Sequence, residues 1–185
     1  MAPRQGFQQG VALLRGINVG RAKRIAMADL RALFTELGFS EPRTLLNSGN
    51  VVFGSPVHGT AKAGALIEAA LLERLGVPSR VTVLDAETLA AIVAGNTLAA
   101  DTADHSRLLG FTLPGQAERD VLAPLLEQEW GEDRLQIGPL AAYVSCPGGV
   151  LDSKLAMKVS KLLGEATTSR NWNTFIKLHA LCGNS

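Results

Sequence analysis

The order of apolar patterns in the first half of the chain is the feature that most constrains its fold. Short runs typical of strands lie at residues 11–14, 44–46, 51–53 and 80–84. Helical periodicity separates the first run from the second, over residues 27–37, and the third from the fourth, over residues 66–75. The order strand, helix, strand, strand, helix, strand is that of a split β-α-β, or ferredoxin-like, unit.

The second half repeats part of this order. Strand patterns lie at residues 108–113, 134–137 and 141–145, and apolar residues recur at helical spacing from Val121 to Trp130 and from Leu155 to Leu163. Pro124 either kinks the first of these helices or lies near its start. After Ser169 the pattern is helical again. We therefore expect an α+β protein of two ferredoxin-like subdomains, the second with a C-terminal helix in place of its last strand.

The chain has 185 residues, a length that fits one large domain or two small ones. Residues 95–105 show no clear periodicity. The expected organisation is a subdomain over residues 1–95, a linker over 96–105 and a second subdomain over 106–185.

Charge and composition exclude several classes of protein. Eighteen Lys and Arg against seventeen Asp and Glu give a net charge of +1, which does not favour a generic polyanion binder. Only 5% of residues are aromatic, so stacking on RNA bases is not favoured either. No secretory signal or membrane span is recognisable, and the two cysteines do not form a C-x-x-C pair. A cytoplasmic protein without a membrane partner is expected.

The familiar catalytic and cofactor motifs are missing from the sequence. Gly16 and Gly20 are followed by Arg21, which is not the P-loop pattern, and neither G-x-G-x-x-G nor G-x-S-x-G occurs. The three histidines are far apart and have no cysteine or carboxylate at ligand spacing. We therefore expect no metal and no cofactor, and the sequence leaves open whether the protein is an enzyme.

Polar, glycine-rich corners are the remaining places where a binding site is expected. They lie at residues 15–20, 47–50, 147–154 and 169–174. Their side chains supply positive charge and neutral hydrogen-bonding groups, which suit an anionic ligand. The candidate ligand-binding residues are Arg15, Asn18, Asn47, Ser48, Asn50, Ser153, Lys154, Arg170, Asn171 and Asn173. The alternative is that these residues form turns and helix caps, as Asn, Gly and Ser commonly do.

The ferredoxin-like order carries a geometric expectation. Its first and second strands run parallel with the third between them, so the loop at 15–20 and the turn at 47–50 follow the same edge of the sheet. Two strand spacings are about 10 Å. Arg15, Asn18, Asn47 and Asn50 should then line one polar patch.

The chain also resembles a known family at these corners. The match runs from about residue 11 to 182 and includes Leu13 to Gly20, Leu37-Gly38-Phe39, Asn47 to Phe53, Ser153-Lys154-Leu155 and Arg170 to Thr174. In these motifs the chain resembles the domain of unknown function 1697 family. The resemblance implies a bacterial α+β protein of two ferredoxin-like parts and implies no activity. The chain departs from the family at Arg21, where members often have glycine, and at Leu45, where they often have tyrosine.

Three functions remain open at this point. The first is a site for a small anionic ligand such as a nucleotide or phosphorylated metabolite. The second is a protein-interaction or structural module without ligand chemistry. The third is a weak nucleic-acid-binding module. The oligomeric state and the convergence of the polar loops of the two halves into one site are also open.

Overall fold

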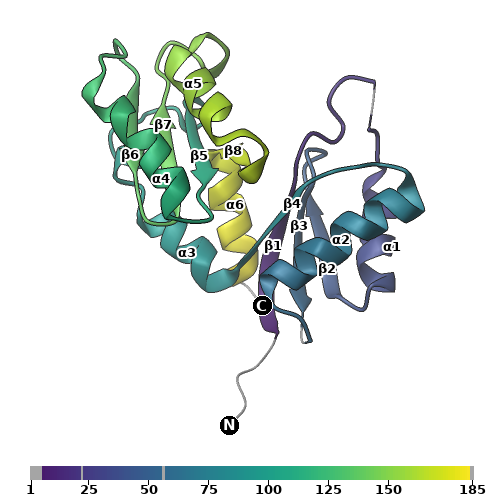
Figure 1. Cartoon of the computed structure of the whole chain (residues 1–185). Coiled ribbons are helices and arrows are strands. Elements are labelled where there is room, and N and C mark those ends of the chain that lie inside the picture. Colours follow the sequence, from purple (N-terminus) through teal and green to yellow (C-terminus); the bar gives the residue numbers. More distant parts are fainter. Residues whose placement is uncertain (1–5, 22, 56, 184–185) are drawn as a thin grey trace. The chain divides into compact units, whose positions relative to one another are not determined.

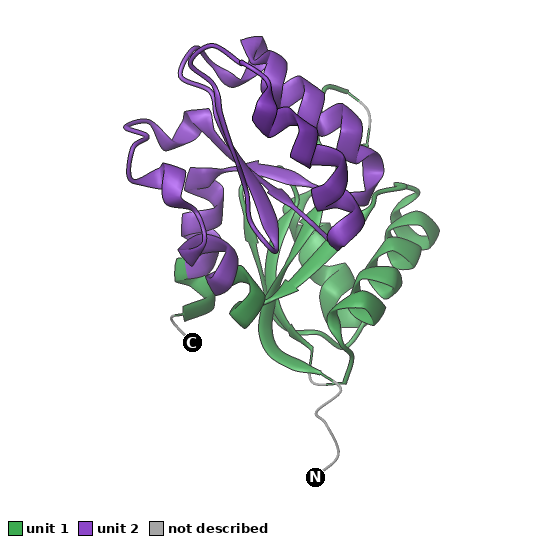
Figure 2. Cartoon of the chain, turned by 60° about the vertical axis from the view of Figure 1, so that its left-hand side comes forward, with its two compact units in different colours: residues 1–89, 180–185 green, residues 90–179 purple. Residues whose placement is uncertain are grey.

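The computed structural model describes residues 6–21, 23–55 and 57–183 of the chain. Within these ranges the protein is α+β, with two four-stranded antiparallel sheets and six α-helices (Figure 1). The chain forms two compact units (Figure 2). Unit 1 comprises Met1–Leu89 with Ala180–Ser185, and unit 2 comprises Ala90–His179. A division at a linker over residues 96–105 stays a prediction.

Unit 1 follows the element order expected from its apolar pattern. Its elements are β1 (Phe7–Leu14), α1 (Met27–Glu36), β2 (Ser40–Leu45), β3 (Asn50–Ser55), α2 (Thr60–Leu75), β4 (Val81–Asp85) and the start of α3 (Ala86–Ala94). The strands lie in the order β2-β3-β1-β4. Both β1 and β2 pair antiparallel with β3. They therefore run in the same direction, and the loops that follow them leave the same edge of the sheet.

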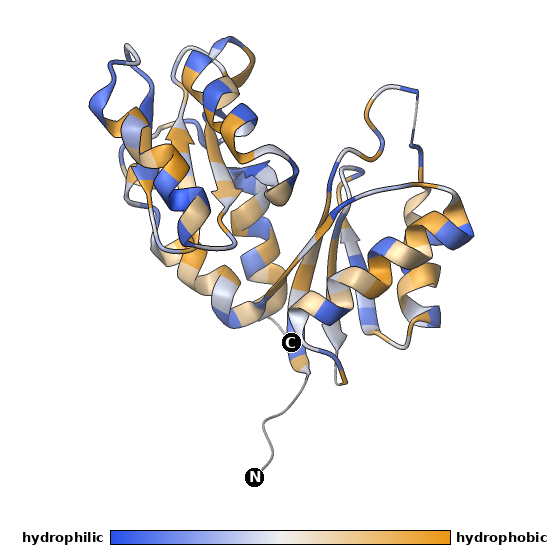
Figure 3. Cartoon of the chain, in the orientation of Figure 1, coloured by the Kyte–Doolittle hydropathy of each residue, from blue (hydrophilic) through white to orange (hydrophobic). Residues whose placement is uncertain are grey.

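The core of unit 1 lies between one face of this sheet and the helices α1 and α2. Alternate residues of a strand share a face, which places Ala12, Leu14, Val51 and Phe53 in this core. The helices add buried residues at helical spacing, namely Leu30, Leu33, Phe34, Ile67, Ala70 and Leu71. Hydrophobic (orange) and hydrophilic (blue) residues accordingly alternate along α1 and α2 (Figure 3).

Unit 2 holds the second sheet. Its elements are the end of α3, β5 (Leu108–Thr112), α4 (Gln116–Leu122), β6 (Arg134–Ile137), β7 (Ala141–Ser145), α5 (Lys154–Leu163), β8 (Ser169–Asn171) and α6 (Trp172–Gly183) up to His179. The strands lie in the order β6-β7-β5-β8. Near Pro124 a new turn begins: α4 ends at Leu122 and a short 3-10 helix spans Ala123–Glu127.

The expectation that a helix replaces the last strand of the second half is wrong. Residues 169–171 form β8, which pairs with β5 through Leu109↔Asn171, Gly110↔Arg170 and Phe111↔Ser169. The strand has three residues, all polar, so it has no apolar alternation by which a sequence pattern could reveal it. Its backbone hydrogen bonds to β5 form it, and α6 then begins at Trp172.

The two faces of the unit 2 sheet have different surroundings. Phe111, Ala142 and Val144 point to a core that α4 and α5 complete with Leu122, Leu125, Leu155 and Val159. The opposite face carries Tyr143 and Gln136, which are cross-strand partners. Tyr143 Oη donates to the Ile92 carbonyl at 2.7 Å, and Gln136 Nε2 donates to the Gly95 carbonyl at 2.7 Å. The end of α3 and the segment after it therefore pack on this second face.

Two further features bear on the class of protein. Over residues 6–21, 23–55 and 57–183, no helix combines the length and the apolar character that crossing a membrane requires. Both Cys146 and Cys182 are present as thiols. Burial raises the pKa of the Cys146 thiol above its ordinary value, which lowers its reactivity as a thiolate.

Candidate functional site

The loop after β1 and the turn after β2 lie side by side in unit 1. Asn18 Nδ2 donates to the backbone carbonyl of Asn47 at 2.7 Å, and the Leu14 N–H donates to the Gly49 carbonyl at 2.8 Å. The expected proximity of the two corners follows from their shared sheet edge. Two hydrogen bonds, one of them between residues 29 positions apart in the sequence, join them directly.

The side chain of Asn18 holds the loop together, because it both accepts and donates hydrogen bonds. Its Oδ1 accepts from the Ile25 N–H at 2.8 Å, and its Nδ2 also donates to the Ile25 carbonyl at 3.0 Å. Its backbone has a φ of 54°, which Asn adopts more readily than most residues. The side chain of this sequence-predicted site residue is therefore occupied in holding the loop closed.

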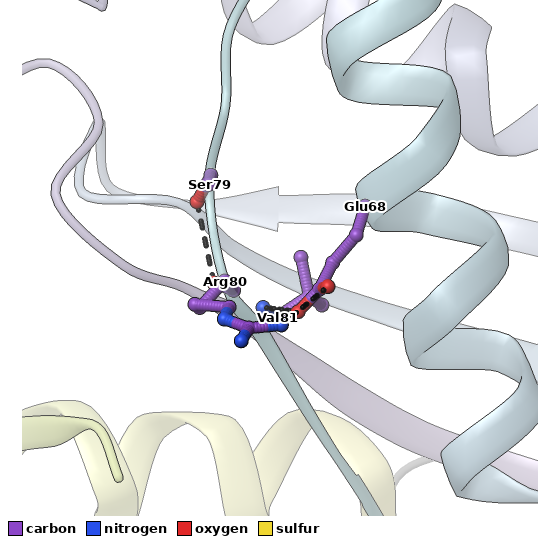
Figure 4. A network of polar contacts seen from close by, with 4 residues as sticks. All are labelled: Glu68, Ser79, Arg80 and Val81. Carbon is purple, nitrogen blue, oxygen red and sulfur yellow. Dashed lines mark hydrogen bonds and ion pairs between the residues drawn. The ribbon is translucent and has the colours of Figure 1, made fainter. Parts of the chain in front are cut away.

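Arg15 directly follows β1, and its backbone forms hydrogen bonds with the two residues that precede β4. The Arg15 N–H donates to the Arg80 carbonyl at 2.9 Å, and Ser79 Oγ donates to the Arg15 carbonyl at 2.9 Å. Figure 4 shows the neighbouring contacts, in which Glu68 of α2 accepts from the Val81 N–H at 2.8 Å and from Arg80 at 3.3 Å. These bonds fix the base of the Arg15 side chain, which is half-buried.

The turn at 47–50 is partly internal to the fold. Asn50 is fully buried, and its Nδ2 donates to the Leu45 carbonyl and to Ser48 Oγ, both at 2.9 Å. Ser48 and Asn50 thus stabilise the turn itself. Asn47 is exposed and stands next to Asn18.

A pocket of about 450 Å³ opens where these segments meet the start of α1. Six residues line it, and we call it the α1 pocket: Asn18, Arg24, Ile25, Ala26, Met27 and Asn47. Asn18 and Asn47 are the members expected from the sequence. Arg24 was missed, although three basic residues, Arg21, Lys23 and Arg24, follow the loop.

The start of α1 and the side chain of Arg24 bring hydrogen-bond donors to this pocket. Ala26 is the N-cap, and it has no side chain that can accept from the first N–H groups of the helix. Asp29 in the first turn is the acidic residue of this helix end. Arg24 Nη2 donates to the Gly20 carbonyl at 3.1 Å, which directs the guanidinium back over the loop while most of its donors remain available.

In unit 2, Ser153 acts as the N-cap of α5. Its Oγ accepts from the Ala156 N–H at 2.9 Å and donates to Asp133 at 2.7 Å. The residue is buried, with 3% of its surface exposed. Lys154, the first residue of α5, is exposed. The interpretation of Ser153 as a helix cap is confirmed.

The corner at 169–174 joins β8 to α6. Asn171 Oδ1 accepts from the N–H and the hydroxyl of Thr174, both at 3.0 Å, and so caps α6. Arg170 Nη1 donates to Thr168 Oγ1 at 2.9 Å and to the Ser169 carbonyl at 2.8 Å. Burial lowers the pKa of Arg170 to about 10, so the guanidinium remains charged at neutral pH. Asn173 is exposed in the first turn of α6.

In the part of the chain that the structure describes, no three His, Cys, Asp or Glu side chains gather in a way that could hold a metal ion. The geometry instead provides hydrogen-bond donors, two turns and a pocket beside a helix start.

Comparisons with known proteins point to a family and a fold. A model of the family described as "Protein of unknown function (DUF1697)" matches residues 7–143. A solved structure of a conserved bacterial protein from Streptococcus pneumoniae is similar, with 24% sequence identity and a TM-score of 0.75. The similarity covers 94% of this chain and 98% of that chain. The comparison with curated proteins found no match.

Proposed function

The chain belongs to the DUF1697 family of proteins of unknown function, and we propose that its α1 pocket binds a small anionic ligand such as a nucleotide or phosphorylated metabolite. One observation carries the proposal: Arg24 lines the pocket beside the start of α1, where Ala26 offers no side-chain cap. Free N–H groups and the helix dipole attract anions at such an end.

Each part of the α1 pocket has a role in this proposal. The guanidinium of Arg24 supplies a charged fork for a phosphate or carboxylate. Asn47 supplies an exposed amide, while Asn18 holds the loop in place. Ile25 and Met27 form an apolar wall for the uncharged part of the ligand.

Arg15 is a secondary candidate for contacting the ligand, because its backbone is held by hydrogen bonds to the residues that precede the adjacent strand, β4. Ser153, Lys154, Arg170, Asn171 and Asn173 stay predictions as ligand residues. Nucleic-acid stacking has less support, since Phe53, Phe111 and Tyr143 on the strands are buried with at most 3% exposed.

We also propose the finer architecture. The strand orders β2-β3-β1-β4 and β6-β7-β5-β8, each with two helices between the strands, support a ferredoxin-like fold for both units. A cytoplasmic location is part of the same proposal, supported by two cysteines that remain thiols.

The test is a titration of the purified chain with inorganic phosphate, adenosine monophosphate and a glucose phosphate, followed by thermal shift and calorimetry. We expect at least one phosphate compound to bind saturably. Arg24→Ala should weaken that binding by about 10- to 100-fold, because a hydrogen bond to a charged group contributes roughly 1.5–3 kcal/mol. Added salt should weaken it too.

Arg21→Ala is the matched control, since it removes the same charge from the same loop at a residue that does not line the pocket. Equal losses of affinity in the two variants would mean that the phosphate compound binds a diffuse basic surface and not a defined site. Absence of binding by all three compounds would refute the proposed function.

A further inference from the structure

A second pocket lies in unit 2, apart from the α1 pocket in the sequence and in character. It has a volume of about 430 Å³, within the range of small-molecule sites. We call it the β6 pocket, and it is lined by Leu98, Asp101, Thr102, Gly131, Glu132, Arg134, Ser145 and Pro147. Five of these side chains are polar or charged.

Strand pairing fixes one wall of the β6 pocket. Arg134, the first residue of β6, is the antiparallel partner of Ser145, the last residue of β7. Directly paired residues point to the same face of a sheet, with their Cβ atoms about 5 Å apart. This is the face that also carries Gln136 and Tyr143, so the pocket lies beyond the end of α3.

The segment after α3 supplies the opposite wall. The 3-10 helix Thr97–Ala99 is held at its start by the Gln136 side chain, which accepts from the Thr97 N–H at 2.9 Å. Thr102 then donates to the Leu98 carbonyl at 2.8 Å and lies 3.3 Å from Ser145 Oγ. Ser145 is 5% exposed, so two hydroxyls meet at the buried base of the pocket.

Charges of both signs surround this base. Asp101 and Glu132 stand on two different segments, and Arg134 follows Glu132 at the start of β6. In the described part of the chain, none of these three side chains takes part in an ion pair or a hydrogen bond. Two carboxylates and a guanidinium thus face one pocket without neutralising one another.

From this arrangement we propose that the β6 pocket binds a small zwitterion, a free α-amino acid. The ammonium group lies against Asp101 and Glu132, and the carboxylate accepts from the guanidinium of Arg134, which suits a two-oxygen acceptor. The Thr102 hydroxyl, which already donates to the Leu98 carbonyl, accepts a remaining hydrogen bond of the ammonium group together with Ser145 Oγ. Leu98 and Pro147 form the apolar wall for the amino-acid side chain.

The experiment is a thermal-shift and calorimetric titration of the full chain with each of the common free amino acids, repeated with the N-acetyl and the amide derivative of any that binds. We expect one or a few amino acids to bind and both derivatives to lose binding. Arg134→Gln and the double variant Asp101→Asn/Glu132→Gln should each weaken binding by about tenfold or more, since each removes a charge-assisted contact.

Lys158→Gln and Glu129→Gln are the matched controls, because both side chains are exposed in unit 2 and neither lines the pocket. They should leave affinity unchanged, as should Arg24→Ala in unit 1.

No binding by any amino acid, binding that survives acetylation of the amine, or equal losses in the controls would overturn the proposal. A diamine or a dicarboxylate binding where amino acids do not would overturn it as well. Because the α1 pocket is tested with phosphate compounds and Arg24, failure of one proposal leaves the other standing.

Discussion

Asn18 and Asn47 are joined by a hydrogen bond of 2.7 Å from the side-chain amide of the first to the backbone carbonyl of the second. The bond connects the loop after β1 to the turn after β2. The same amide group also donates to the Ile25 carbonyl, and its oxygen accepts from the Ile25 N–H. One side chain therefore sets the positions of both walls of the α1 pocket.

Replacing Asn18 should destabilise unit 1 and weaken anion binding together. Asn18→Ala removes three hydrogen bonds and places alanine at a φ of 54°. We expect a loss of about 2–4 kcal/mol in the free energy of unfolding, from bonds of about 1 kcal/mol each and the left-handed backbone. Chemical denaturation measures it.

Asn18→Gly separates the two causes, because glycine keeps the backbone freedom and loses the amide. It should recover about 1 kcal/mol relative to Asn18→Ala. If both variants were as stable as the natural chain, the amide would have no role in holding the loop.

Periodicity predicted most elements of this fold because their apolar residues are sorted to one face. β1 and α1 are examples, in which Leu14, Leu30 and Phe34 enter one core. β8 could not be predicted in this way, since Ser169, Arg170 and Asn171 form a strand only through the backbone of β5.

The candidate site was predictable in part. The turn signal at Asn47 and the cap signal at Ser153 are local, so the sequence carries them. The role of Asn18 depends on Asn47, 29 residues away, and no local pattern contains that contact. Nor does spacing show which residue of the basic run faces the α1 pocket, and the structure selects Arg24.

A methyl group at Gly49 should be costly for reasons beyond backbone conformation. A Cβ there would lie 2.8 Å from Leu14 Cβ and 2.8 Å from Ile17 Cδ1, and the residue has a φ of +81°. Gly38 has the same φ of +81° with nothing within 4 Å of its Cβ position. Gly38→Ala should therefore lose about 1–2 kcal/mol from the backbone alone, and Gly49→Ala about 1–3 kcal/mol more from overpacking.

Paired urea denaturation of these two alanine variants measures the difference. Equal losses would mean that Leu14 and Ile17 move aside without cost, in which case the tight contact of the turn with β1 would not contribute to stability.

Ser153 should stabilise unit 2 both as the N-cap of α5 and as a hydrogen-bond donor to Asp133. Ser153→Ala should lower the free energy of unfolding by about 1–2 kcal/mol, because the Ala156 N–H loses its acceptor and Asp133 loses its donor. Ser160→Ala, at an exposed position of α5, is the control and should raise stability by about 0.5 kcal/mol.

Ser153→Asp gives a sharper test of the same pair. Aspartate is normally a good N-cap. Here its carboxylate would face that of Asp133, so it should not restore stability at neutral pH. Full recovery by aspartate would show that the contact with Asp133 contributes nothing.

Tyr143 should make stability fall at alkaline pH. Burial raises the pKa of Tyr143 from 10.0 to about 12. Between these values the unfolded chain releases the phenol proton and the folded chain retains it, so unfolding becomes more favourable as pH rises. The full loss is about 2–3 kcal/mol and is complete once pH passes the folded pKa.

The ionisation of Tyr143 can be measured without interference from other tyrosines, because the chain has a single tyrosine. Tyrosinate absorbance of the native protein should rise near pH 12, and in denaturant near pH 10. Tyr143→Phe loses the hydrogen bond to the Ile92 carbonyl and should be less stable by about 1–2 kcal/mol at neutral pH. Because phenylalanine does not titrate, the gap between the two proteins should close as pH rises above about 10, and Tyr143→Phe should be the more stable protein near pH 12. A gap that stayed constant, or a native titration near pH 10, would mean that the phenol is reached by water in the folded protein, and the contact between β7 and the end of α3 would then be open rather than packed.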